Sequence, residues 1–181
     1  MNNEGAGFSP LLNFINPLNK IRSKMHVIMN DDTFLKKGFH ISTDQSLLDF
    51  DMIFTYLDEE SYWAQGIPIA TLKKAISNSL CFGVYKQNVQ VGFARIVTDK
   101  ATFAYLCDVF ILPEFRGAGL SKWLVQTIIQ YPDLQGLRRW SLATADAQGL
   151  YKQFGFTEIT RPERWMEIFT PYQSFKKEIQ D

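Results

Sequence analysis

The sequence predicts one mixed α/β domain, in which a mostly antiparallel sheet ends in a parallel pair of strands and is flanked by helices. Three observations support this prediction. Apolar residues alternate along three successive segments between residues 80 and 111, and the short turns between these segments make them antiparallel neighbours. An apolar stripe with helical spacing follows over residues 120–131. A further apolar strand, residues 137–144, completes a strand–helix–strand unit, whose two strands should run parallel.

The chain before this sheet predicts one more strand and two helices. Residues 39–43 alternate in the manner of a short strand. Residues 46–49 have the spacing of a capping box, and apolar residues on one helical face follow over residues 50–57. A loop over residues 59–67 leads to Pro68, which stands where a second helix can start.

The two ends of the chain differ in character. Residues 147–154 predict a short helix, and residues 156–159 and 165–169 predict closing strands. Glycine and proline interrupt any periodicity in residues 1–24, which we expect to form a poorly ordered or loosely docked extension. Residues 25–181 are then expected to form the single domain.

Composition excludes several classes of protein. Of the 181 residues 46% are hydrophobic, 14% aromatic and 21% charged, which rules out intrinsic disorder. The formal net charge of zero argues against a nucleic-acid partner, and no apolar run approaches the about 18 residues of a membrane span. Cys81 and Cys107 have no metal-ligand spacing, so we expect buried reduced thiols, no metal and a cytoplasmic location.

The loop between the last antiparallel strand and the helix has the properties of an anion site. Gly117 and Gly119 let a ligand approach the backbone, and the helix N-terminus behind them carries about half a positive charge. Arg116 and Lys122 add positive charge, so the loop favours phosphate or pyrophosphate. Neither a Walker loop nor a dinucleotide fingerprint fits this glycine spacing. The alternative is a glycine loop that serves only a tight turn.

Two motifs resemble the GNAT superfamily of N-acyltransferases. Residues 116–121, Arg-Gly-Ala-Gly-Leu-Ser, resemble its R/Q-x-x-G-x-G/A acetyl-CoA loop, and residues 111–115 resemble the V-x-P-x-[YF] that leads into it. Residues 147–156 are similar to its second signature, A-x-x-x-Y-x-x-x-G-F. Ser121 stands where the family usually has Gly or Ala, and Thr144 stands where many members have Asn.

The resemblance implies a GNAT-like fold and a set of cofactor contacts. Acetyl-CoA is expected in a splay between the two parallel strands, where the pantetheine amides meet the backbone of Phe110 and Ile111. The loop residues implied to hold its phosphates are Arg116, Gly117, Ala118, Gly119, Leu120 and Ser121.

Several residues are candidates for catalysis or for binding the acceptor, and each also has a purely structural explanation. The resemblance places Tyr151 beside the sulfur, where a phenol of pKa about 10 can donate a proton to the departing thiolate. Asp108, late in its strand, is the candidate general base. Glu59 and Glu60 could attract a cationic amine beside Tyr62 and Trp63. The alternatives are that Tyr151 only packs on its helix, that Glu59 and Glu60 are solvated, and that Tyr62 and Trp63 belong to the core.

The resemblance implies an N-acetyltransferase that moves an acetyl group directly from acetyl-CoA to a primary amine of a small molecule or a protein. Because many family members are dimers, the resemblance also allows a homodimer. The alternative is that the chain is a non-catalytic domain that binds or senses acyl-CoA, because the glycine loop supports both functions equally.

Overall fold

The computed structural model describes residues 32–172 of the chain. A five-stranded sheet forms its centre, with β1 (Phe39–Ser42), β2 (Leu80–Lys86), β3 (Val89–Thr98), β4 (Phe103–Ile111) and β5 (Arg139–Ser141) in that spatial order. Strands β1 to β4 are antiparallel neighbours, and β5 lies parallel to β4. The predicted mixed α/β class, with one parallel pair in a mostly antiparallel sheet, is confirmed.

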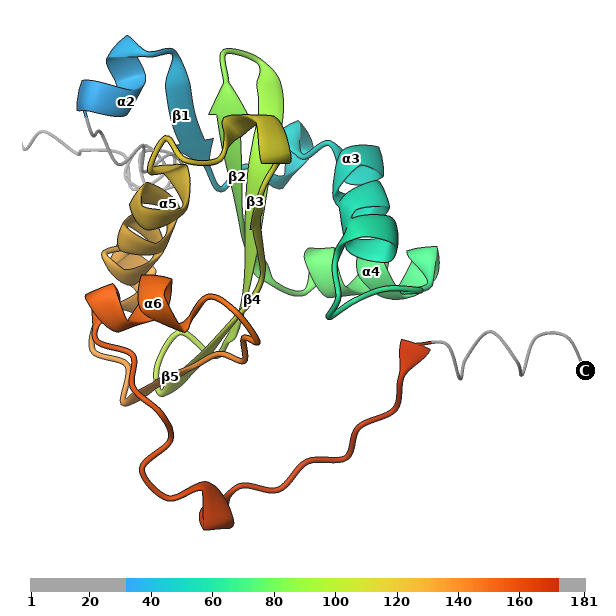
Figure 1. The fold of residues 1–181 in the computed structure, drawn as a ribbon, viewed down its shortest axis with the longest axis vertical. Helices are drawn as coiled ribbons and strands as arrows, with labels where there is room; N and C mark the ends of the chain where they lie inside the picture. Colours follow the sequence, from blue (N-terminus) through green and yellow to red (C-terminus); the bar gives the residue numbers. More distant parts are fainter. Residues whose placement is uncertain (1–31, 173–181) are drawn as a thin grey trace, which may run out of the picture.

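Helices cover both faces of this sheet (Figure 1). One face carries α2 (Asp32–Lys36), α5 (Leu120–Ile129) and α6 (Gln148–Tyr151), and the other carries α3 (Phe50–Thr55) and α4 (Ile69–Ser77). Each face buries its own apolar cluster. Phe82, Leu106 and Leu124 belong to the first cluster, whereas Ile53, Leu72 and Phe93 belong to the second.

The capping of α3 differs in detail from the prediction. Asp49 is the N-cap residue itself, because its Oδ1 accepts a hydrogen bond from the backbone N–H of Met52 at 3.0 Å. The helix also runs on into a π-helical turn, Tyr56–Glu60, where a loop was expected from residue 59. This wider turn changes the direction in which its side chains leave the helix axis.

A bulge in β4 separates its two halves. Arg95 of β3 pairs with Cys107 and Phe93 pairs with Phe110, so one β3 residue opposes two β4 residues between these pairs. Asp108 lies in the bulge with a φ of 54°. On its other side β4 pairs with β5 only from Phe103 to Tyr105. The remainder of β4 has no ladder partner on that side among the described residues, which is the splay that the resemblance implies.

The end of the chain departs from the prediction. Residues 156–159 and 165–169, expected to be closing strands, belong to no strand in the structure, and β5 covers only the middle of the predicted residues 137–144. A single 3-10 turn, Pro162–Arg164, interrupts this irregular chain, which leaves the domain as Figure 1 shows. The alternating pattern is present, but the peptide groups of these residues have no strand beside them to pair with.

Two further expectations concern the chain as a whole. The predicted extension, residues 1–24, lies outside the described residues. Within residues 32–172, no helix has the length and apolar character needed to cross a membrane.

Candidate functional site

The loop between β4 and α5 requires glycine at two positions. Gly117 and Gly119 have φ values of 77° and 87°, in the left-handed region that residues with a Cβ rarely adopt. Gly119 is the N-cap residue of α5, and the first helical hydrogen bond runs from the N–H of Trp123 to its carbonyl at 3.1 Å. The preceding amides of the first turn, from Leu120 to Lys122, therefore have no acceptor within the helix. They form the donor end of a helix dipole.

Arg116 braces this loop against the rest of the domain. Its Nε donates to the carbonyl of Ile111 at 2.9 Å, and its Nη2 donates to the hydroxyl of Tyr56 at 2.9 Å. Burial raises the pKa of the Tyr56 phenol against the opposing charge of Arg116, so this hydroxyl remains protonated. The guanidinium thus connects the end of β4 with the π-helical turn 60 residues earlier in the chain.

A cavity of about 500 Å³ opens between this loop, the end of β4, the π-helical turn and α6. Most residues that the sequence singled out line it: Phe110, Ile111, Arg116, Gly117, Gly119, Leu120, Ser121, Tyr62, Trp63 and Tyr151. Ala118 belongs to the same loop but is not among the lining residues, and neither are Glu59 and Asp108. The structure therefore brings the glycine loop, the aromatic pair and Tyr151 to one place.

Aromatic rings form one wall of this cavity. Tyr56 stacks on Phe110 with ring centroids 3.8 Å apart, and Trp63 lies 6.5 Å from Tyr56. Tyr62 meets Trp63 edge to face at 5.0 Å. The Tyr62 hydroxyl accepts a hydrogen bond from the N–H of Ala145 at 2.8 Å, which ties the loop after the π-helical turn to the segment before α6.

Tyr151 reaches the cavity from α6. Its side chain is only 8% exposed, and the ring of Phe156 meets it edge to face at 5.9 Å. Burial raises the pKa of Tyr151 to about 12, and the nearby Tyr62 and Asp146 act in the same direction. The phenol is consequently protonated at every physiological pH and available as a hydrogen-bond donor.

Two carboxylates, Glu60 and Asp146, line the cavity. Of the two carboxylates that the sequence proposed for an amine, Glu59 and Glu60, only Glu60 lines the cavity. Sequence reasoning could not choose between them because it placed both residues in a loop, whereas the π-helical turn decides which of them faces the cavity. Sequence reasoning missed Tyr56, which lies outside the apolar stripe over residues 50–57. A π-helical turn is frequent at functional sites, but nothing in the local residue pattern announces one.

Asp108, the sequence candidate for a base, is held elsewhere. Its Oδ2 accepts a hydrogen bond from Nε of Arg95 at 2.7 Å, and Nη1 of Arg95 donates to the Ser79 hydroxyl at 3.2 Å. Burial opposes the charge on Arg95, but Asp108 and Cys107 outweigh it, so the pKa of Arg95 is raised. The Asp108 side chain is 8% exposed, and its carboxylate forms an ion pair with Arg95.

Among residues 32–172, neither a cysteine thiol nor a metal cluster contributes to the site. Cys81 and Cys107 are free, and burial raises the pKa of each thiol to about 12, so neither is a reactive thiolate. No group of three or more metal-ligating side chains occurs within residues 32–172.

Comparison with known proteins identifies the scaffold. The family model "Acetyltransferase (GNAT) family" matches residues 50–156. A provisionally assigned acetyltransferase of Gibberella zeae is 34% identical over 146 residues, which cover 68% of this chain and 81% of that protein. The crystal structure of a provisionally assigned GNAT acetyltransferase from Xanthomonas campestris pv. campestris is 52% identical, with a TM-score of 0.72 over 74% of this chain and 94% of that one.

A third relative matches a smaller part. Thialysine N-epsilon-acetyltransferase of Mus musculus is 29% identical over 68 residues, which cover 35% of this chain and 40% of that protein. The chain thus spans less than half of this relative's length.

Proposed function

Because this chain belongs to the GNAT family of acetyltransferases, we propose that it transfers the acetyl group of acetyl-CoA directly to a primary amine of a small molecule or a protein. Its relatives are acetyltransferases, so the chain is an acyltransferase rather than a non-catalytic acyl-CoA-binding domain. The finer assignment, the amine acceptor and the residues that act on it, rests on the cavity beside the glycine loop.

The cavity has the two features that acetyl-CoA requires. The unpaired amides of Leu120, Ser121 and Lys122, at the positive end of α5, suit a pyrophosphate. Gly117 and Gly119 leave these amides uncovered, since no Cβ stands in front of them. The family resemblance extends this phosphate cradle to Arg116 and Ala118.

The free side of β4 suits the pantetheine arm. Phe110 and Ile111 line the cavity beyond the last β4–β5 pair. Arg116 binds the Ile111 carbonyl, but other backbone groups on this edge of β4 have no strand partner among residues 32–172 and remain available to the two amides of that arm. This coincidence of an unpaired strand edge and an open helix N-terminus in one cavity is the observation that carries the proposal.

Acetyl-CoA supplies a thioester, whose acyl carbon an amine can attack and whose thiol is a good leaving group. Tyr151 is proposed to stabilise that leaving group. With the Tyr151 pKa at about 12 and a thiol near 8.5, complete proton transfer to the thiolate would cost about 5 kcal/mol. We therefore assign Tyr151 to hydrogen-bond donation toward the sulfur, which needs no ionised phenol.

The acceptor side is assigned to Tyr62, Trp63 and the carboxylates beside them. Glu60 lines the cavity and Glu59 precedes it in the π-helical turn, so both give this rim a negative charge that attracts an ammonium group. The match to thialysine N-epsilon-acetyltransferase, whose name specifies an amine substrate, supports this class of acceptor.

A base must remove a proton from the ammonium form of the acceptor before it attacks. Asp108 stays a prediction for this role; bound by Arg95 and away from the cavity lining, it would have to act through an intervening group. Glu60 and Asp146 line the cavity and need no such relay.

The test is acetyl-CoA turnover with a panel of small amines and lysine-containing peptides, followed by release of the CoA thiol. We expect turnover with at least one amine and micromolar binding of CoA in calorimetry. Binding of CoA without turnover of any amine, or no binding at all, would contradict the proposal.

A further inference from the structure

Tyr56 combines a buried, fixed ring with a place in the cavity beside the glycine loop. The residue is 6% exposed, yet it lines that cavity. Its ring stacks on Phe110 with an interplanar angle of 11°, and the Trp63 ring packs against it at a tilt of 48°. The π-helical turn that begins at Tyr56 closes with a hydrogen bond from the N–H of Ser61 to the Tyr56 carbonyl at 2.9 Å. Ring and backbone are both held, so the hydroxyl has a fixed position.

The hydroxyl of Tyr56 carries a proton that no described residue accepts. A phenol hydroxyl offers one proton to donate and lone pairs to accept. A lone pair accepts the hydrogen bond from Nη2 of Arg116 at 2.9 Å, and within residues 32–172 this is the one side-chain hydrogen bond of Tyr56. Because Tyr56 and Arg116 both line the cavity, the proton of this hydroxyl is available to a ligand bound there.

Arg116 makes the Tyr56 hydroxyl a stronger donor. A cation that donates to the phenol oxygen draws electron density from the O–H bond, and hydrogen bonds in such a chain strengthen one another. Arg116 forms no ion pair within residues 32–172, so no described carboxylate cancels its charge.

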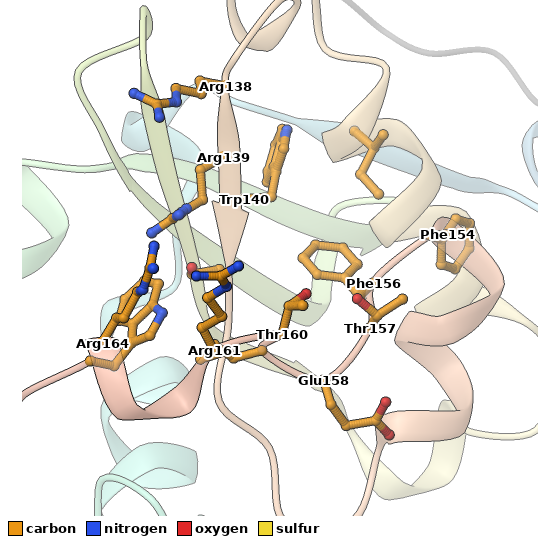
Figure 2. A pocket seen from close by; sticks show the side chains of 15 residues that line it. Arg138, Arg139, Trp140, Phe154, Phe156, Thr157, Glu158, Thr160, Arg161 and Arg164 are labelled. Carbon is orange, nitrogen blue, oxygen red and sulfur yellow. The ribbon is translucent and has the colours of Figure 1, made fainter.

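Arg116 is also the one Lys or Arg side chain among the described residues that line this cavity. The other arginines that gather at a cavity line a separate one, of about 570 Å³, beside β5 (Figure 2): Arg138, Arg139, Arg161 and Arg164. No residue lines both cavities. The pair of Arg116 and Tyr56 is therefore the side-chain donor that carries positive charge at the site.

Tyr56 and Tyr151 reach this cavity from two different elements, the π-helical turn and α6. Burial is the main cause of the raised pKa of both phenols, and the charge of Asp146 raises the pKa of both further. Asp146 lines the same cavity. A single carboxylate that acts on both phenols requires both to lie near it, so the two tyrosines face one part of the cavity.

This arrangement places Tyr56 beside the acyl group, on the premise of the proposed function. In that proposal the pantetheine arm follows Phe110 and Ile111, and the sulfur lies at Tyr151. The acyl carbon is bonded to the sulfur and carries the carbonyl oxygen. This oxygen therefore falls in the part of the cavity that both phenols face, while the Tyr56 ring lies directly on Phe110.

We infer that Tyr56 is a catalytic residue that donates a hydrogen bond to the carbonyl oxygen of the thioester. As the amine nitrogen bonds to the acyl carbon, the π electron pair of the carbonyl moves onto the oxygen, where Tyr56, with Arg116 behind it, stabilises the negative charge. When the carbonyl re-forms, the carbon–sulfur bond breaks and its electron pair leaves on the sulfur, beside Tyr151. The nitrogen loses its extra proton to the general base, so the products are an amide and the CoA thiolate, and Tyr56 keeps its proton throughout.

The first experiment compares two CoA analogues that differ in the carbonyl group. In acetyl-dethia-CoA a methylene replaces the sulfur and the carbonyl oxygen remains, whereas S-ethyl-CoA keeps the sulfur and lacks that oxygen. Calorimetry measures the affinity of both analogues for wild type and for Tyr56→Phe, which keeps the ring on Phe110. We expect the variant to bind acetyl-dethia-CoA about three- to tenfold more weakly and S-ethyl-CoA equally well, because one hydrogen bond to the carbonyl oxygen is lost.

Equal losses for the two analogues would overturn the role of Tyr56, since a residue that only supports the fold cannot distinguish a carbonyl from a methylene. Unchanged affinity for both would overturn it as well, and the proposed function would stand in either case. If wild type binds neither analogue, the proposed function fails and this inference fails with it. The two failures are therefore distinguishable.

The second experiment measures turnover with the amine that the acceptor panel identifies. Tyr56→Phe should lower kcat by about 10²–10³-fold and change the KM for acetyl-CoA by less than about tenfold. Tyr131→Phe is the matched control and should keep the parental kcat, because Tyr131 is also 6% exposed, packs edge to face on Phe82 and does not line this cavity. A folded Tyr56→Phe with the parental kcat, or with a raised KM alone, would overturn the inference.

Discussion

The carboxylate of Asp108 accepts a hydrogen bond from Nε of Arg95 at 2.7 Å, with side chains 8% and 16% exposed. This pair spans the bulge that separates the two halves of β4. Asp108 can occupy the bulge because Asp and Asn tolerate the left-handed φ of 54° better than most residues. The pair therefore stabilises the point at which β4 begins to diverge from β5.

Asp108→Asn should destabilise the fold by about 3 kcal/mol, because it leaves the Arg95 charge buried without a counter-charge. Asn preserves the backbone geometry, so the effect is electrostatic. The variant Arg95→Met/Asp108→Asn removes both charges and should recover most of the loss in urea denaturation.

The same double variant tests the base assignment. If the stable double variant loses turnover by more than about a hundredfold, Asp108 acts as the base; if turnover persists, the role falls to Glu60 or Asp146. For the stability prediction above, equal free energies of unfolding of wild type and Asp108→Asn would show that the Arg95–Asp108 ion pair contributes little.

Ser121→Glu should separate cofactor binding from stability. A carboxylate in the first turn of α5 complements the helix dipole and should leave the melting temperature equal or slightly raised. The same charge repels a pyrophosphate, so the CoA affinity should fall at least about tenfold. Ser121→Gln, of equal size and no charge, is the control. Equal CoA affinity of the two variants in calorimetry would place the phosphates elsewhere.

Tyr151→Phe removes one hydrogen-bond donor to the departing sulfur, so it should lower kcat by about 10²–10³-fold and leave CoA affinity nearly unchanged. The phenyl ring keeps the contact with Phe156, so packing is preserved. With a pKa of about 12, ionisation of this phenol should cause no loss of wild-type activity up to about pH 10. Turnover of Tyr151→Phe at the parental rate would exclude the proposed role.

The Asp99 carboxylate should make the stability of the fold depend on pH in the acidic range. Its carboxylate accepts hydrogen bonds from the Thr102 hydroxyl and from the N–H groups of Thr102, Ala101 and Phe103 in the turn before β4, which hold its pKa well below the ordinary value. Because the folded pKa is lowered, this stabilisation is present above the unfolded pKa of about 3.9 and is lost as the pH falls below it.

Asp99→Ala should therefore be less stable than wild type at pH 7, and the difference should narrow at strongly acidic pH. Urea denaturation at several pH values measures it. Asp99→Asn, which keeps an acceptor without the charge, should fall between the two. A difference that stays constant with pH would mean that the charged form of Asp99 does not stabilise the turn.

Local signals in the sequence determined the order of the elements and the glycine loop. Alternation and helical periodicity predict β2 to β4 and α5 because neighbouring residues decide which face each side chain takes. Gly117 and Gly119 mark the loop because their positive φ values are a property of single residues. The family resemblance predicted the role of Tyr151, because this residue is part of a contiguous sequence motif.

Only the tertiary structure decided the remaining features. The choice of Glu60 over Glu59 depends on the π-helical turn, and the separation of β4 from β5 depends on the bulge at Asp108. Arg116, read from the sequence as a charge beside the phosphates, also binds Tyr56 from a distant helix. The pattern of residues 165–169 is that of a strand, but a strand forms only where another edge can pair with it, and its own chain does not place these residues beside one.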